Sequence, residues 1–209
     1  MNMDNVTIAI LAGGNSSRFG SEKALAQFRG TPLVSHMIAS TTGLCSRIII
    51  VASDEEQQSM IGSVVKDVEI VVDADDVEKS ALNGSVTAFE YSDNEYTLIL
   101  PVDTPLVKRK LLTTLLELRE GHGAVVPAWP NGFVEPLHAV YMTEHAYDKG
   151  LQVLENGQRR MQDLLDSLTN VLYVQTEILK MFDPNLETFS NANTPKELKQ
   201  LEEEVIRAR

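Results

Sequence analysis

Cysteine and long apolar runs are scarce in this sequence. Its 209 residues include one cysteine, Cys45, so no disulfide bond can form within the chain. The longest apolar stretches, residues 47–52 and 96–102, have the length of β-strands and are far too short to span a membrane. The first residues lack the basic start and the apolar stretch of a secretory signal. We therefore expect a cytoplasmic protein.

Positive charge is scarce as well. The chain has 18 Lys and Arg residues against 30 Asp and Glu residues, a formal net charge of -12 at pH 7. Nucleic acids and anionic membranes both favour a basic surface, so we expect neither as a partner. A small anionic substrate is not excluded, because local cations or a bound divalent metal dominate at short range. The hydrophobic content of 43% is ordinary, and we expect one domain over residues 1–209.

Predicted strands and helices alternate through the first 127 residues. Apolar runs predict strands at residues 6–12, 48–51, 69–72, 96–102 and 124–127. Thr31-Pro32 predicts the start of one helix, and Asp54 with Gln57 predicts the start of another. This order implies right-handed crossovers and an α/β, Rossmann-like three-layer fold with a mainly parallel sheet. In such folds ligands bind beyond the carboxyl ends of the strands.

The regular alternation of predicted strands and helices ends after residue 127, but no linker or repeat separates the two parts. The sequence there predicts strands at residues 137–142 and 171–174 and helices at residues 144–155 and 160–168. A final helix is predicted to begin at Thr194-Pro195. We expect these elements to complete the same domain.

The most informative motif follows the first predicted strand. Residues 11–14 (Leu-Ala-Gly-Gly) form a strand end that becomes a glycine-rich turn, and Arg18 and Lys23 follow it. Glycine lets the backbone approach a ligand closely, and backbone N–H groups with two cations suit a polyphosphate. The spacing fits neither the GxGxxG turn nor the GxxxxGK[ST] loop. The alternative interpretation is a plain glycine-rich turn between a strand and a helix.

A second motif follows the strand predicted at residues 96–102. Asp103 leaves the tip of this buried strand and precedes a Thr-Pro turn, a position that suits a carboxylate ligand of Mg²⁺. The alternative is that Asp103 caps the following helix. If Asp103 and Lys23 act on one triphosphate, they must lie on the same edge of the sheet. A wide separation would overturn the assignment as an enzyme.

Five segments together resemble the molybdenum cofactor guanylyltransferases, a family of nucleotidyltransferases. They are the LAGG turn and its cations (11–23), PVDTPL (101–106), EPLHAVY (135–141), GQRR (157–160) and FSNANTPKEL (189–198). The segments occur in the family's order and span nearly the whole chain, and the last is the most specific. The resemblance implies transfer of GMP from GTP to the terminal phosphate of molybdopterin cofactor, with Mg²⁺ and release of pyrophosphate.

The motifs and the resemblance together give an expected set of site residues. The nucleotide is expected to contact Leu11, Ala12, Gly13, Gly14, Lys23, Ser53, Asp73 and Asp103, in a part that spans about residues 1–127. Lys23 and Arg18 are expected to stabilise charge, and Asp103 to hold Mg²⁺. The acceptor is expected to contact His138, Arg159, Arg160, Asn191 and Asn193, in a part that spans about residues 128–209. A structural histidine, a basic surface pair and a helix cap are the alternatives for His138, the two arginines and Asn193.

The sequence departs from the family at two places. Ser53 falls where relatives commonly carry Asn, and residues 80–84 (Ser-Ala-Leu-Asn-Gly) replace a G-P-L-A-G turn. If that turn contacts the base, the choice of base stays open. Asn83 offers both donors and acceptors, so we expect base reading of some kind to survive the replacement.

Other functions stay open at this stage. A related transferase could use CTP or another phosphorylated acceptor. A glycosyltransferase could use Asp73 and Asp75 with a sugar nucleotide and would release a nucleoside diphosphate. A silent nucleotide-binding module would bind GTP without releasing pyrophosphate. In the favoured interpretation the partners are GTP, molybdopterin cofactor and, transiently, enzymes that deliver or receive the cofactor.

Overall fold

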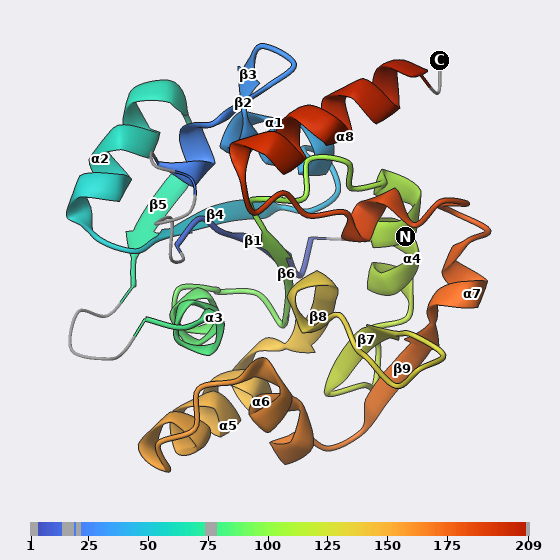
Figure 1. The fold of residues 1–209 in the computed structure, drawn as a ribbon. Helices are drawn as coiled ribbons and strands as arrows, with labels where there is room; N and C mark the ends of the chain where they lie inside the picture. Colours follow the sequence, from blue (N-terminus) through green and yellow to red (C-terminus); the bar gives the residue numbers. More distant parts are fainter. Residues whose placement is uncertain (1–3, 14–18, 20–21, 74–78, 208–209) are drawn as a thin grey trace.

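A seven-stranded sheet forms the centre of the protein (Figure 1). The structure is a computed structural model, and it describes residues 4–13, 19, 22–73 and 79–207. In sheet order the strands are β5 (Glu69–Val72), β4 (Arg47–Ala52), β1 (Val6–Leu11), β6 (Tyr96–Pro101), β8 (Ala139–Met142), β7 (Ala124–Ala128) and β9 (Val171–Gln175). Four neighbours, β5, β4, β1 and β6, run parallel. β8 runs antiparallel to both β6 and β7, and β9 is parallel to β7.

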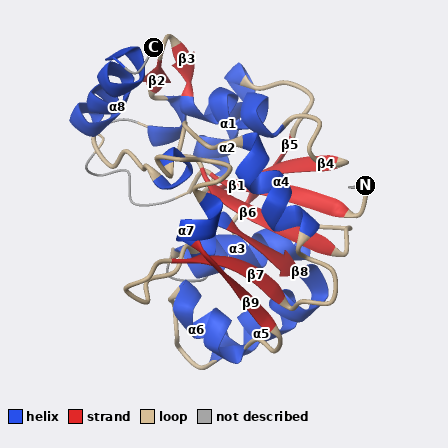
Figure 2. Cartoon of the chain, turned by 90° about the vertical axis from the view of Figure 1, so that its right-hand side faces the viewer, coloured by secondary structure: helices blue, strands red, loops and turns tan. Residues whose placement is uncertain are grey.

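Helices cover both faces of this sheet. On one face lie α1 (Leu33–Thr41), α2 (Glu55–Val64), α4 (Arg109–Glu117), α7 (Thr176–Leu179) and α8 (Pro195–Arg207). On the other lie α3 (Ala81–Glu90), α5 (Thr143–Glu155) and α6 (Met161–Ser167). Figure 2 shows α1, α2 and α4 on one side of the sheet and α5 and α6 on the other. The predicted three-layer α/β fold with a mainly parallel sheet is confirmed.

The alternation of side chains along the strands creates the two apolar cores. Successive strand residues point to opposite faces of a sheet. In β1, Ile8 and Ile10 therefore join the core beneath α1 and α4, while Ala9 and Leu11 join the core beneath α3 and α5. A strand buried on both faces reads as an unbroken apolar run, which is why the sequence reveals β1 so clearly.

Two predicted helix starts are confirmed and one is wrong. Asp54 caps α2 by accepting the backbone N–H of Gln57, and Thr194 caps α8 by accepting that of Glu197. Thr31 and Pro32 instead form β3, which pairs with β2 (Gln27–Phe28), and α1 begins at Leu33 without a side-chain cap. Arg29 and Gly30, at φ 53° and 77°, make the two-residue turn of this hairpin.

The strand predicted at residues 137–142 is also shorter than expected. A 3₁₀ turn, η3 (Pro136–His138), precedes β8, so His138 lies outside the strand. Pro136 has no N–H to give to a strand ladder, which favours the turn at this point. Among the described residues, no helix is long and apolar enough to cross a membrane.

Candidate functional site

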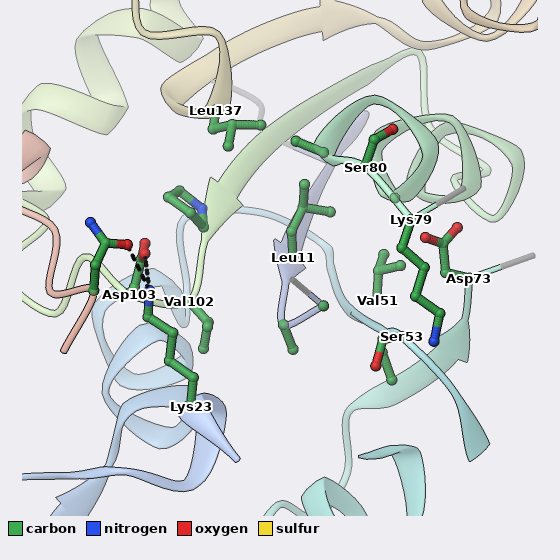
Figure 3. Close-up of a pocket in the computed structure, with 17 residues that line it drawn as sticks. Leu11, Lys23, Val51, Ser53, Asp73, Lys79, Ser80, Val102, Asp103 and Leu137 are labelled. Atoms are coloured by element: carbon green, nitrogen blue, oxygen red, sulfur yellow. Dashed lines mark hydrogen bonds and ion pairs between the residues drawn. The ribbon is translucent and has the colours of Figure 1, made fainter. Parts of the chain in front are cut away.

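A pocket opens at the carboxyl ends of β1, β4, β5 and β6, beside the N-terminus of α3 (Figure 3). Its volume is about 360 Å³, within the range of small-molecule sites. Its lining includes seven residues predicted to contact a nucleotide: Leu11, Ala12, Gly13, Lys23, Ser53, Asp73 and Asp103. Asn193, predicted for the acceptor, also lines it. Gly14 and Arg18 lie outside the described residues, as does Asp75.

Lys23 and Asp103 meet at one end of this pocket. The Lys23 Nζ lies 2.5 Å from the Asp103 Oδ2 and donates at 3.1 Å to the Oδ1 of Asn193. Both charged side chains are largely buried, with 17% and 15% of their surface exposed. Residues 80 and 170 positions apart in the chain thus form one polar cluster, which we call the cation end. The separation that would have overturned the enzyme assignment does not occur.

Local contacts hold the cation end in place. Lys23 begins the 3₁₀ turn η2 (Lys23–Leu25), which Glu22 caps through the backbone N–H of Ala24. The side-chain amide of Gln57 donates to Glu22 at 2.6 Å and so ties this turn to α2. At the opposite side of the cluster, the backbone N–H of Ala192 donates to the Asp103 carbonyl at 3.0 Å, which positions the segment that carries Asn193.

The strand end before the glycine turn is held against β4. The backbone N–H groups of Ala12 and Gly13 both donate to the carbonyl of Val51, at 2.9 and 3.2 Å. A Cβ at Gly13 would come within 3.4 Å of the Cβ of Ser53, so little space separates the two strand ends. A Cβ at position 13 would make an ordinary van der Waals contact, so β1 and β4 end side by side on the pocket wall without requiring glycine there.

The opposite end of the pocket holds Asp73, and Lys79 near it. Asp73 is 7% exposed, and its Oδ1 accepts from the side chains of Asn83 at 2.9 Å and Thr87 at 2.7 Å. Lys79 extends past Asp73 toward Ser53 (Figure 3). The sequence reasoning missed Lys79. Its position could have identified it: Lys79 follows β5 and directly precedes Ser80, the N-cap of α3. Residues between a strand and the next helix lie at the edge of the sheet where ligands bind.

Asn83 lies outside the pocket lining, and direct contact of its side chain with a base stays a prediction. Its side chain is 3% exposed, lies on the inner side of α3, and donates to Asp73. Residue type alone does not reveal which face of a helix turns toward a ligand, so the sequence did not indicate this inward orientation. Asn83 instead fixes the orientation of the Asp73 carboxylate.

Four residues predicted to contact the acceptor lie outside the pocket lining. His138 is buried, with its Nε2 3.3 Å from the Thr104 hydroxyl and its ring against Phe189, and burial lowers its pKa to about 3. Arg159 donates to the backbone carbonyls of Leu154 and Gln158. The remaining two are exposed or paired at the surface: Asn191, and Arg160, which binds Asp163. Contact of these four with an acceptor stays a prediction.

The donor set at the cation end fits Mg²⁺. Mg²⁺ in proteins often binds one or two carboxylates together with substrate phosphates rather than a closed cage of side chains. Asp103 supplies one carboxylate at the pocket, and Asn193 adds an amide oxygen. Within the part of the chain that the structure describes, no three His, Cys, Asp or Glu residues cluster as a ready-made metal site. One carboxylate and one amide oxygen at the pocket suit a metal that also binds a substrate phosphate.

Comparison with known proteins identifies the family to which this chain belongs. A model of the MobA-like NTP transferase domain matches residues 8–171. The chain belongs to this family. A probable molybdenum cofactor guanylyltransferase of Bacillus cereus is 34% identical to this MobA-like transferase over 198 residues, or 94% of this chain and 95% of that protein. One from Methanosarcina mazei is 29% identical over 203 residues, or 92% of this chain and 88% of that protein. The protein is thus a nucleotidyltransferase.

Solved structures lead to the same family. Molybdopterin-guanine dinucleotide biosynthesis protein A from Archaeoglobus fulgidus superposes on this MobA-like transferase with a TM-score of 0.82 and 28% identity, over 96% of this chain and 99% of that chain. A 4-diphosphocytidyl-2C-methyl-D-erythritol synthase from Anaerococcus prevotii has a TM-score of 0.73 at 11% identity, over 98% and 97% of the two chains. The second match shows a shared fold alone, that of the nucleotide-diphospho-sugar transferases.

Proposed function

We propose that the protein transfers GMP from GTP to the terminal phosphate of molybdopterin cofactor. In this reaction a phosphate oxygen of the acceptor bonds to the α-phosphorus of GTP, and the bond from that phosphorus to the β-phosphate bridging oxygen breaks to release pyrophosphate. The observation that carries the proposal is the contact between Lys23 and Asp103 beside the strand end at Gly13. The names of the relatives in Bacillus cereus and Methanosarcina mazei support the choice of substrates.

The side chains at the cation end have separate roles in this proposal. Lys23 binds the triphosphate and stabilises negative charge that grows on the leaving group. Asp103 would hold Mg²⁺, which would supply further charge neutralisation. Asn193, which accepts from Lys23 at 3.1 Å, keeps the lysine directed at the pocket. No protein nucleophile is needed, because phosphoryl chemistry of this kind depends on positioning and electrostatic stabilisation.

The test is pyrophosphate release measured across GTP, CTP, ATP and UTP, each with and without molybdopterin cofactor and with and without Mg²⁺. We expect release only when GTP, the cofactor and Mg²⁺ are present together. Release with CTP in place of GTP would favour a cytidylyltransferase. Nucleotide binding without release under any condition would make the protein a silent binding module. Release of a nucleoside diphosphate from a sugar nucleotide would point to a glycosyltransferase.

A further inference from the structure

The pocket has two polar ends separated by apolar walls. Lys23 and Asp103 form the cation end, and Asp73 and Lys79 lie at the other (Figure 3). The lining includes the apolar side chains of Leu11, Val51 and Ala81. Leu11 lies between the two ends (Figure 3). A triphosphate at the cation end directs the nucleoside toward Asp73 and Lys79. The flat faces of a base then meet apolar walls, and only its edge meets charged groups.

Asp73 presents a carboxylate whose orientation is fixed. It is 7% exposed, and hydrogen bonds from Asn83 and Thr87 hold its Oδ1. Asn83 and Thr87 both belong to α3, so the carboxylate is coupled to a rigid helix. A carboxylate in a pocket wall favours ligand edges that carry N–H donors.

Lys79 adds a cation that is able to move. Its Nζ lies 3.3 Å from the Oδ2 of Asp54, and the two side chains are 49% and 44% exposed. An ion pair this exposed contributes little stability, so the ammonium can change partner at low cost. Lys79 also lines the pocket, and Ser53 beside it offers only a short hydroxyl. The Asn83 amide already donates to Asp73. Lys79 is therefore the long side chain at this end of the described pocket that can donate a hydrogen bond to a ligand.

We propose that Lys79 determines base specificity by donating a hydrogen bond to the 6-oxo group of guanine, beside Asp73. This inference rests on the proposed function and deepens it. Guanine carries N–H donors at positions 1 and 2 next to an acceptor at position 6, which matches a carboxylate beside an ammonium. Cytosine and adenine present an amino donor where guanine has its oxo acceptor, and an ammonium cannot accept from it.

The experiment compares GTP with 6-thio-GTP, which keeps both N–H donors but replaces the 6-oxo oxygen with sulfur, a weak acceptor. Dissociation constants are measured by calorimetry, with Mg²⁺ and without acceptor, for the unchanged protein, Lys79→Ala and Lys79→Arg. We expect the unchanged protein to favour GTP by about 10-fold, the scale of a charge-assisted hydrogen bond at a half-exposed site. Lys79→Ala should lose this preference by binding GTP more weakly, and Lys79→Arg should keep part of it.

The controls separate this inference from the proposed function. Lys66 is exposed and does not line the pocket, so Lys66→Ala should bind both nucleotides as the unchanged protein does. If Lys79→Ala weakens the binding of GTP and of 6-thio-GTP equally, the inference is overturned. The lysine would then act on the sugar, the phosphates or the local fold. Unchanged GTP binding in Lys79→Ala would overturn the inference too. Failure of the unchanged protein to bind GTP would instead overturn the proposed function.

Discussion

At the scale of single residues, Asp103 is the group on which the chemistry depends. Its carboxylate lies 2.5 Å from the Lys23 ammonium, and its backbone carbonyl accepts from Ala192. Contacts from segments near both ends of the chain therefore hold this residue, one through its side chain and one through its backbone. The alternative suggested by the sequence, a helix cap, does not describe this side chain, because α4 begins at Arg109 with Lys108 as its N-cap.

The predicted role of Asp103 is tested by Asp103→Asn. Asparagine keeps the size of the side chain and an oxygen that accepts from Lys23, but it removes the negative charge that a hard cation requires. We expect Mg²⁺-dependent pyrophosphate release to fall by roughly 10²-fold or more, with a melting temperature close to that of the unchanged protein. Pyrophosphate release is measured across a Mg²⁺ titration. A variant with ordinary turnover would contradict metal binding at this position.

At the scale of elements, α3 connects the pocket to the C-terminal part of the chain. Its N-terminus lines the pocket, and its middle packs against α5. The close approach depends on Gly150 of α5, where an added Cβ would come within 2.5 Å of the Val86 Cγ2 of α3. Val86 is β-branched and 5% exposed, so its side chain cannot easily adopt another rotamer to make room.

Two glycine-to-alanine substitutions form a matched pair that tests this packing. Gly62 lies in α2, and its nearest neighbour to an added Cβ is the Ile70 Cδ1 at 3.8 Å, an ordinary contact. Gly62→Ala should stabilise the protein by roughly 0.5–1 kcal/mol through helix propensity alone. Gly150→Ala should destabilise the protein by about 1 kcal/mol. Overpacking costs roughly 1–3 kcal/mol, which exceeds the gain of roughly 0.5–1 kcal/mol from helix propensity. Urea unfolding measures the free energy of unfolding of both variants. Stabilisation by Gly150→Ala would show that the two helices separate freely.

At the scale of the whole molecule, segments from three parts of the chain meet at His138. Its ring contacts Thr104 in the loop after β6 and Phe189 in the 3₁₀ turn η4 (Glu187–Phe189). The residue is 3% exposed, and burial lowers its pKa from 6.5 to about 3. The folded protein therefore keeps this imidazole neutral where the unfolded chain would protonate it.

This difference predicts a pH dependence of stability. Between pH 6.5 and about 3 the unfolded state binds a proton at this histidine that the folded state does not bind, so stability falls as the pH falls. One such proton contributes about 1.4 kcal/mol per pH unit. We expect His138→Gln to reduce the loss of stability between pH 6.5 and 5 in urea unfolding. An imidazole NMR signal that disappears in His138→Gln yet titrates near pH 6 in the unchanged protein would contradict this prediction.

The sequence by itself determined most of the sheet and most of the pocket. The apolar run 6–11, the glycine at 13 and Asp103 follow from local rules of strand burial, turn conformation and strand order, and these rules act over a few residues. The short hairpin at residues 27–32 was missed because its turn places Arg29, a residue that seldom has positive φ, in that conformation.

Only the tertiary structure decided which side chains share a space. It turned Asn83 inward onto Asp73 and brought Asn193 to Lys23 across 170 positions. These contacts depend on the order of strands in the sheet and on the face that each helix buries. Those features arise from packing of the whole chain, so no local pattern of residues specifies them.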